Sequence, residues 1–180
     1  MDVTEMQSVP EEPMTYLEET IGNITRQWKD GITPEVSYHS QMALLYGIMK
    51  NADECRLHAA LIPDTASIND KVNKYISLAR ILVYEKHVEE AIGYYQKCLD
   101  IDTEHEMILE EIAWCCYHIK QYTEAEKWFR QLTILEPEWG NVWEGLALTL
   151  AEQKNYIEAI VYFTKALELV TNAINVDYYE

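Results

Sequence analysis

The chain has 180 residues, and its 14 Lys and Arg against 31 Asp and Glu give a net charge of −17. It is 48% apolar and 11% aromatic, which excludes a largely disordered chain and fits one domain with a small appendage. Because phosphate groups attract basic faces, this acidity argues against binding to nucleic acid or to anionic lipid. We therefore expect no nucleic-acid partner and no membrane partner.

The first residues, MDVTEMQSVPEEPM, lack the basic and apolar regions of a secretory signal. The longest apolar run, residues 42–49, is far too short to span a membrane. The four cysteines contain no CxxC pair, which indicates a reducing compartment. These features predict a cytoplasmic protein.

The chain begins with a polar, acidic segment, residues 1–12, which we expect to be disordered. Residues 13–71 are predicted to form an N-terminal helical region. Its first helix begins at Pro13 and ends at Gly31, and it carries an apolar face with the periodicity of a helix. The residues of that face are Leu17, Ile21, Ile24 and Trp28.

Two further helices are expected in this region, one ending near Lys50 and one running from Asp53 to just before Pro63. We interpret residues 34–62 as a diverged helical hairpin that caps the repeats described next. The alternative is a separate element for oligomerisation or partner contact. When residues 38–71 are aligned as a fourth repeat without a shift, Leu45 and Leu57 fall at the positions that are alanine in the other repeats, so the alignment fails. With a two-residue slip it puts Gly47 and Ala59 at small positions, but it puts Pro63 at an aromatic one.

Three segments of equal length follow one another and align without a gap: 72–105, 106–139 and 140–173. Each predicts two antiparallel helices, because positions 4, 7, 8 and 11 form one helical stripe and positions 20, 24, 27 and 28 form another. Alanine recurs at positions 8 and 20, where a larger side chain would hold the helices apart. These alanines are Ala79, Ala113 and Ala147, and Ala91, Ala125 and Ala159.

These segments resemble the tetratricopeptide repeat, over a little more than half of the chain. The resemblance implies an all-α, right-handed solenoid of helical hairpins with an N-terminal helical cap, followed by a tail at 174–180. It also implies a concave groove lined by positions 2, 5, 9, 12 and 13 of each first helix, where partner peptides bind.

The groove expected from this resemblance is apolar and aromatic with several carboxylates, which fits an apolar or basic amphipathic segment of a partner. In the alternative interpretation, Trp114 and Tyr117 are covered by the N-terminal helix and form core. The expected groove residues are Asn73, Ile76, Arg80, Tyr84, Met107, Glu110, Trp114, Tyr117, His118, Asn141, Glu144 and Leu148.

The last repeat has an apolar face that no further repeat covers, formed by Ile160, Phe163 and Leu167. Solenoids normally end in a polar cap. We therefore expect a homo-oligomer or another partner at this face, or a fragment of a longer array, in preference to a weak fold-back of the tail.

Few features of the sequence indicate catalysis. We predict that the chain is not an enzyme and has no cofactor and no metal site. Cys115 and Cys116 are adjacent on a helix and point about 100° apart, which favours packing over joint ligation. Cys98 takes a small core position, and the five histidines lie apart in the sequence. We predict a protein-binding scaffold or adaptor. The alternative is a holdase chaperone, because the layout is similar to that of class II chaperones of type III secretion.

Overall fold

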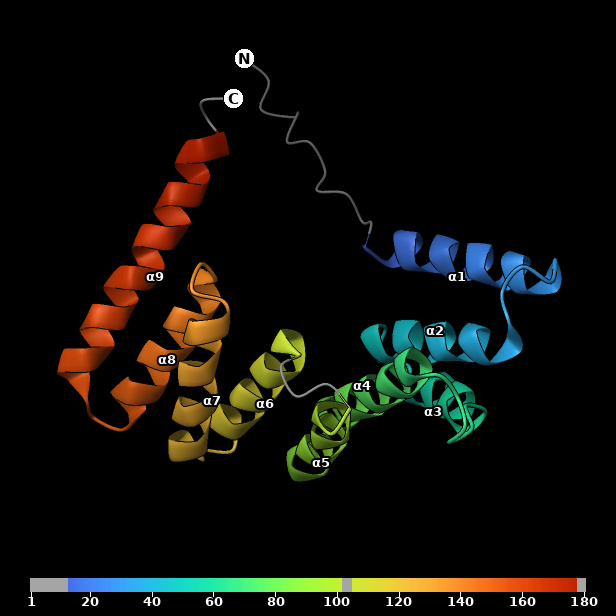
Figure 1. Ribbon diagram of the computed structural model, residues 1–180, viewed down its shortest axis with the longest axis horizontal. Coiled ribbons are helices and arrows are strands. Elements are labelled where there is room, and N and C mark those ends of the chain that lie inside the picture. Colours follow the sequence, from blue (N-terminus) through green and yellow to red (C-terminus); the bar gives the residue numbers. More distant parts are fainter. Residues whose placement is uncertain (1–12, 102–104, 178–180) are drawn as a thin grey trace, which may run out of the picture. The chain divides into compact units, whose positions relative to one another are not determined.

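The computed structural model describes residues 13–101 and 105–177, so the expected disorder of 1–12 lies outside the described residues. The described residues form helices and turns, without strands (Figure 1). None of these helices is long and apolar enough to cross a membrane. The helices are α1 (Pro13–Lys29), α2 (Glu35–Ile48), α3 (Ala52–Ala60), α4 (Ile68–Tyr84), α5 (Val88–Leu99), α6 (Glu106–His118), α7 (Tyr122–Leu135), α8 (Gly140–Glu152) and α9 (Tyr156–Asp177).

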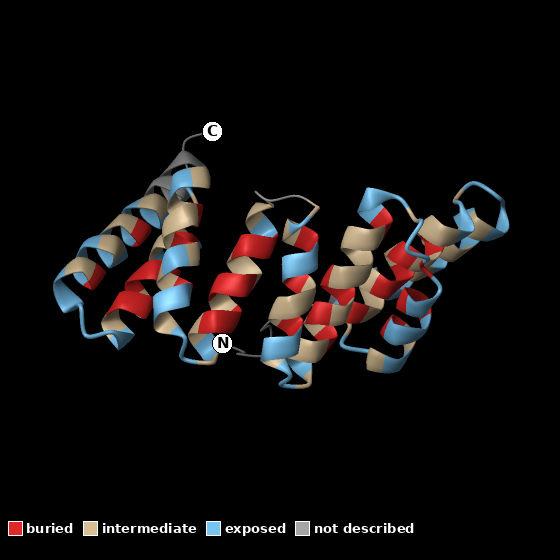
Figure 2. Cartoon of the chain, turned by 60° about the horizontal axis from the view of Figure 1, so that its bottom comes forward, coloured by how far each residue is buried: buried red, intermediate tan, exposed pale blue. Residues whose placement is uncertain are grey.

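The chain divides into two compact units, residues 1–81 and 82–180, and the boundary falls within the last turn of α4. In helices α2 to α9 the buried residues lie along one side, and the other side is intermediate or exposed (Figure 2). This one-sided burial is what the amphipathic period of a helix produces.

In the first unit, α2 and α3 form a hairpin that packs against α4. Asn73 of α4 donates a 3.0 Å hydrogen bond to Ser40 Oγ of α2. A Cβ atom at Gly47 would lie 3.3 Å from the Ser77 backbone, so the small residue lets α2 and α4 approach closely. α4 begins at Ile68, ahead of the expected start of the first repeat, because Ser67 caps it by accepting a 3.2 Å bond from the Asp70 N–H.

The same tight turn joins the helices of each hairpin. A lysine with φ between 58° and 71° follows the first helix in every case, at positions 50, 86, 120 and 154. The residue after it donates its N–H to a carbonyl in the last turn of that helix, as in Asn155 to Leu150 at 2.9 Å and Asn51 to Tyr46 at 2.9 Å. This is the Schellman pattern of helix ends.

The turn at Lys50 also gives the register of the α2–α3 hairpin. The spacing from Lys50 to Lys86 is longer than one repeat, so the hairpin follows the repeat pattern with a two-residue slip. This slip is opposite in direction to the one that places Gly47 and Ala59 at small positions. It places Ala43 and Cys55 there instead, and both are fully buried.

The repeated alanines close the core of the hairpins. Ala113 and Ala125 of α6 and α7 are fully buried, and Ala147 and Ala159 of α8 and α9 are at most 2% exposed. Phe129 of α7 is also fully buried, and its ring lies directly against Gly145 of α8, where a Cβ atom would overlap the ring. Gly145 therefore fixes how closely one repeat packs on the next.

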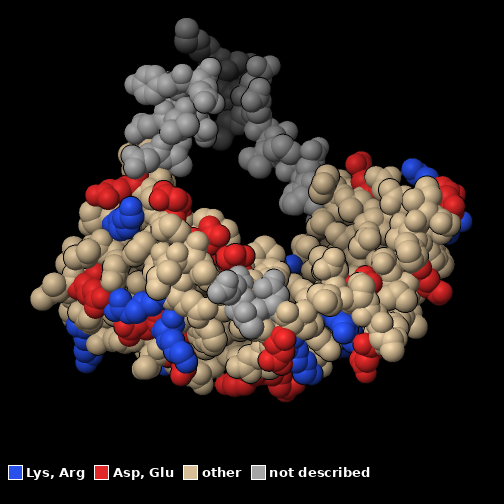
Figure 3. All heavy atoms as spheres, in the orientation of Figure 1, with Lys and Arg blue, Asp and Glu red and all other residues tan. Residues whose placement is uncertain are grey.

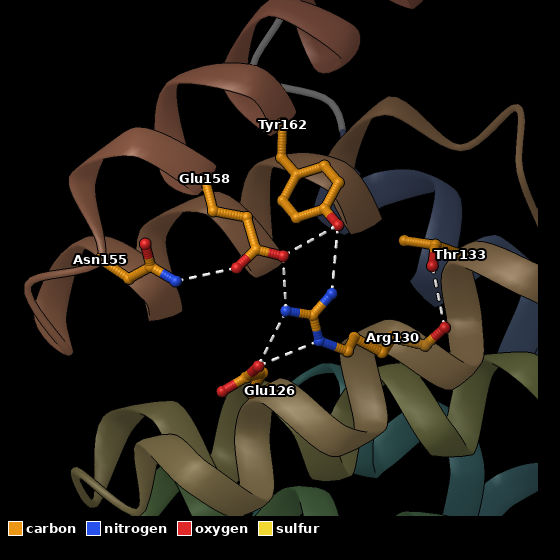
Figure 4. A network of polar contacts seen from close by, with 6 residues as sticks. All are labelled: Glu126, Arg130, Thr133, Asn155, Glu158 and Tyr162. Atoms are coloured by element: carbon orange, nitrogen blue, oxygen red, sulfur yellow. Dashed lines mark hydrogen bonds and ion pairs between the residues drawn. The ribbon is translucent and has the colours of Figure 1, made fainter.

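A polar network connects α7 to α9 in the second unit (Figure 4). The Arg130 guanidinium donates to Glu158 Oε1 at 2.7 Å, to Glu126 Oε1 at 2.9 Å and to Tyr162 Oη at 3.1 Å. Asn155 donates to the other Glu158 oxygen at 2.8 Å. The bonds from Arg130 hold the pKa of Glu158 below its usual value of 4.5.

Candidate partner-binding surfaces of the second unit

An aromatic strip on α6 carries the predicted groove residues of the middle repeat. Trp114 and Tyr117 are half-buried, and Met107 and His118 are exposed. The Trp114 ring packs edge-on against Phe129 at 5.1 Å and stacks with His118 at 6.2 Å. The buried Phe129 thus supports Trp114 from behind, while part of the indole ring stays open to solvent.

Two polar side chains of α8, Asn141 and Glu152, lie beside this strip. Asn141 of α8 donates a short hydrogen bond to Glu110 of α6, and Tyr122 Oη donates to Glu152 Oε2 at 3.3 Å. Burial and the Glu152 carboxylate raise the pKa of Tyr117, so its phenol stays neutral. The predicted groove residues Glu110, Trp114, Tyr117, His118 and Asn141 therefore lie on two adjacent helices.

Glu144 and Leu148 of α8 are exposed and half-buried, respectively. The described Asp and Glu side chains are interleaved with Lys and Arg on the face drawn in Figure 3.

The first unit holds three of the predicted groove residues. Asn73 is engaged by Ser40, and Arg80 is half-buried. Ile76 is only 4% exposed, so little of its side chain is open to a partner in this structure. Burial of an apolar side chain is favourable, whereas the equivalent positions of the later repeats carry Glu110 and Glu144, whose burial would be costly. Tyr84, at the end of α4, is exposed.

The predicted face of α9 is open, and a hollow adjoins it. Phe163 is 37% exposed and Leu167 is 67% exposed, in contrast to the fully buried Phe129 at the equivalent position of the preceding repeat. A hollow of about 400 Å³ between α8 and α9 is lined by Gly140, Asn141, Glu144, Phe163, Ala166, Leu167 and Val170. It joins two groove residues, Asn141 and Glu144, to the predicted oligomer face. In the sequence these residues belong to two separate surfaces, because they lie at different positions of the repeat.

The first unit contains a histidine pair that connects two helices. His39 of α2 and His58 of α3 place their Nδ1 atoms 2.8 Å apart. Tyr46 stacks on His58 at 5.6 Å and Tyr38 meets it edge-on at 5.7 Å. The two histidines come from different helices in a region outside the regular repeats, so no local motif could have signalled the pair.

The four cysteines are buried. Burial raises the pKa of the Cys98 and Cys115 thiols to about 12. Cys98 is fully buried, which confirms the prediction that it packs in the core. Among the described residues, no three His, Cys, Asp or Glu side chains are grouped so that they could hold a metal ion.

This architecture defines an all-α protein of stacked helical hairpins. Three tetratricopeptide repeat models match the sequence, at residues 75–105, 113–138 and 140–173, and together they span half of the chain. The chain belongs to the tetratricopeptide repeat family, whose members are generally non-enzymatic interaction scaffolds. A comparison with curated protein sequences finds no match.

Solved structures of similar fold include two titled as MamA. One has a TM-score of 0.72 at 15% identity, covering 90% of this chain and 93% of that one. The other has a TM-score of 0.69 at 16% identity, covering 93% of this chain and 88% of that one. A third, YrrB, is described as a TPR protein with an unusual peptide-binding site. Its TM-score is 0.64 at 15% identity, and the match covers 87% of this chain and 79% of YrrB.

Proposed function

We propose that this chain is a scaffold or adaptor that binds an apolar or basic amphipathic segment of a partner protein on the aromatic strip of α6 and the adjoining face of α8. The observation that carries the proposal is the half-buried Trp114, whose ring is held by Phe129 and flanked by Tyr117 and His118. Tryptophan and tyrosine held rigidly at a surface are the side chains that most often dominate binding energy.

The surrounding charge sets the preferred chemistry of the partner. Glu110, Glu144 and Glu152 lie on the same two helices as the strip, in a chain of net charge −17. This field attracts Lys and Arg and repels a carboxylate, a phosphate backbone or an anionic lipid. A partner segment with apolar anchors and basic flanks would therefore associate fastest. The peptide-binding site named for YrrB supports a peptide ligand for this fold.

The test is capture of partners from a source lysate by the full chain and by two double variants. Trp114→Ala/Tyr117→Ala removes the anchors, and its far-ultraviolet circular dichroism must match the wild type. Glu110→Lys/Glu144→Lys reverses the charge beside the anchors. Because it also removes the hydrogen bond from Asn141 to Glu110, its circular dichroism must match the wild type as well. Its matched control, Glu89→Lys/Glu138→Lys, makes the same charge change at exposed residues outside the strip.

We expect both strip variants to lose the same specific partner, with an affinity loss on the order of 10-fold or more, while the control keeps it. An unchanged partner list in both strip variants would overturn the proposal.

The captured partner also separates the scaffold from the chaperone alternative. A holdase client aggregates when expressed alone and becomes soluble on co-expression with this chain. A scaffold partner is soluble by itself.

A further inference from the structure

The outer face of α9 differs in kind from that of α7, although the two helices are equivalent parts of successive repeats. Five positions that are polar on α7 or at its C-terminal cap are apolar and exposed on α9. The equivalent pairs, each one repeat apart, are Thr123 and Ile157, Glu126 and Ile160, Lys127 and Val161, Thr133 and Leu167, and Glu136 and Val170. The repeat fold does not require apolar residues at these positions, since α7 packs without them. Large exposed apolar faces mark sites of association.

The packing of the preceding repeat shows which structural element could cover this face. Phe129 of α7 is covered by the helix that follows it, and Gly145 of that helix accepts its ring. Phe163 is the equivalent residue of α9, and it forms a wall of the 400 Å³ hollow. A helix laid along α9 would cover Phe163 and the exposed residues around it, as α8 covers Phe129.

Charge argues that this helix comes from a second copy. Two copies of net charge −17 repel each other over most of their surfaces. Over residues 157–171 of α9, however, the charged residues are Glu158, Lys165 and Glu168. Glu158 is paired with Arg130, and Lys165 offsets Glu168. An apolar, nearly neutral face is complementary to itself, which is what a two-fold interface needs. The basic segment proposed for the α6 strip would gain no electrostatic attraction from this α9 face.

We propose that the outer face of α9, together with the hollow between α8 and α9, is the interface of a two-fold homodimer in which α9 packs against α9 of the second copy. The two proposed surfaces meet at Asn141 and Glu144, which line the hollow, and the α9 substitutions below leave both residues unchanged. A dimer would present two such strips, so its partners would be bound with increased avidity where they can reach both.

The test is sedimentation equilibrium of the purified full chain over a range of concentrations and salt. Ile160→Glu and Leu167→Glu place a charge in the centre of the proposed interface. Ile134→Glu is the matched control, because Ile134 is 80% exposed on α7 and lies outside the α9 face. All three residues are exposed, so the substitutions leave the core intact, and circular dichroism checks this.

We expect a monomer–dimer equilibrium for the wild type and for Ile134→Glu. Each interface variant should raise the dissociation constant by a factor on the order of 100, since a two-fold interface receives every substitution twice. Added salt should strengthen the dimer by screening the repulsion between copies. A wild type that is monomeric at every soluble concentration would overturn the proposal, as would a dimer indifferent to both interface variants or one weakened by salt.

Discussion

His39 and His58 share a single hydrogen bond between their Nδ1 atoms, across the hairpin of α2 and α3. One Nδ1 atom must carry a proton and donate, and the other must be unprotonated and accept. The bond therefore forms when both rings are neutral in different tautomers, or when one ring is protonated and the other is neutral. Burial, followed by the charge of His39, lowers the pKa of His58 below 6.5, although Glu54 opposes the shift. Glu35 lies 4.0 Å from the outer nitrogen of His39. A doubly protonated pair would lose the bond and place two like charges together.

This pair predicts a loss of stability in weak acid. Because the folded-state pKa of His58 is lowered, its contribution to the free energy of unfolding is present in full above pH 6.5. That contribution declines as the pH falls below 6.5, and it is lost once the pH has passed below the folded-state pKa. Urea unfolding from neutral pH down into weak acid measures the decline. His58→Gln should flatten it, whereas His87→Gln, at a largely exposed histidine, should leave it unchanged.

The contact of Phe129 with Gly145 predicts that Gly145→Ala is destabilising, although alanine is the better helix former. The added methyl group would overlap the buried ring, which cannot move aside without disturbing the core. Overpacking of this kind costs about 1–3 kcal/mol. The control is Gly93→Ala in α5, where a Cβ atom meets nothing within 4 Å. It should stabilise the chain by about 0.5–1 kcal/mol. Equal effects of the two substitutions in thermal or urea unfolding would contradict the packing argument.

The network around Arg130 predicts that Glu158→Gln destabilises the second unit near neutral pH. Its hydrogen bonds to Arg130 lower the pKa of Glu158 below 4.5, so its stabilising effect is present above that pH and is lost as the pH falls through the folded-state pKa. The difference in unfolding free energy between wild type and variant should therefore shrink in acid. Glu168→Gln, at an exposed residue of the same helix, should have a smaller effect at every pH.

The lysine turns predict a simple route to a more stable chain. Lys154 has φ of 65°, a left-handed conformation that costs a non-glycine residue about 1 kcal/mol. Lys154→Gly should therefore raise the free energy of unfolding by about 0.5–1 kcal/mol. The adjacent Gln153 has φ of −78°, so Gln153→Gly should lower it. A stabilising effect at both positions would show that the backbone conformation is not the cause.

The sequence determined the features that repeat locally. The constant repeat length, the paired alanines and the helical stripes predicted stacked helical hairpins, because each hairpin buries the same side of the same two helices. The same reasoning predicted an aromatic strip on α6 and an apolar face on α9, since both follow from position within a repeat.

Contacts between residues that no period relates were decided only by the tertiary structure. His39 meets His58 because α2 and α3 pack together at those residues, and Ile76 is buried although its repeat position is exposed in α8. The hollow that joins Asn141 and Glu144 to Phe163 depends on the spacing of α8 and α9. Periodicity specifies which side of a helix is apolar, but which side chains meet across helices depends on close packing of the whole unit.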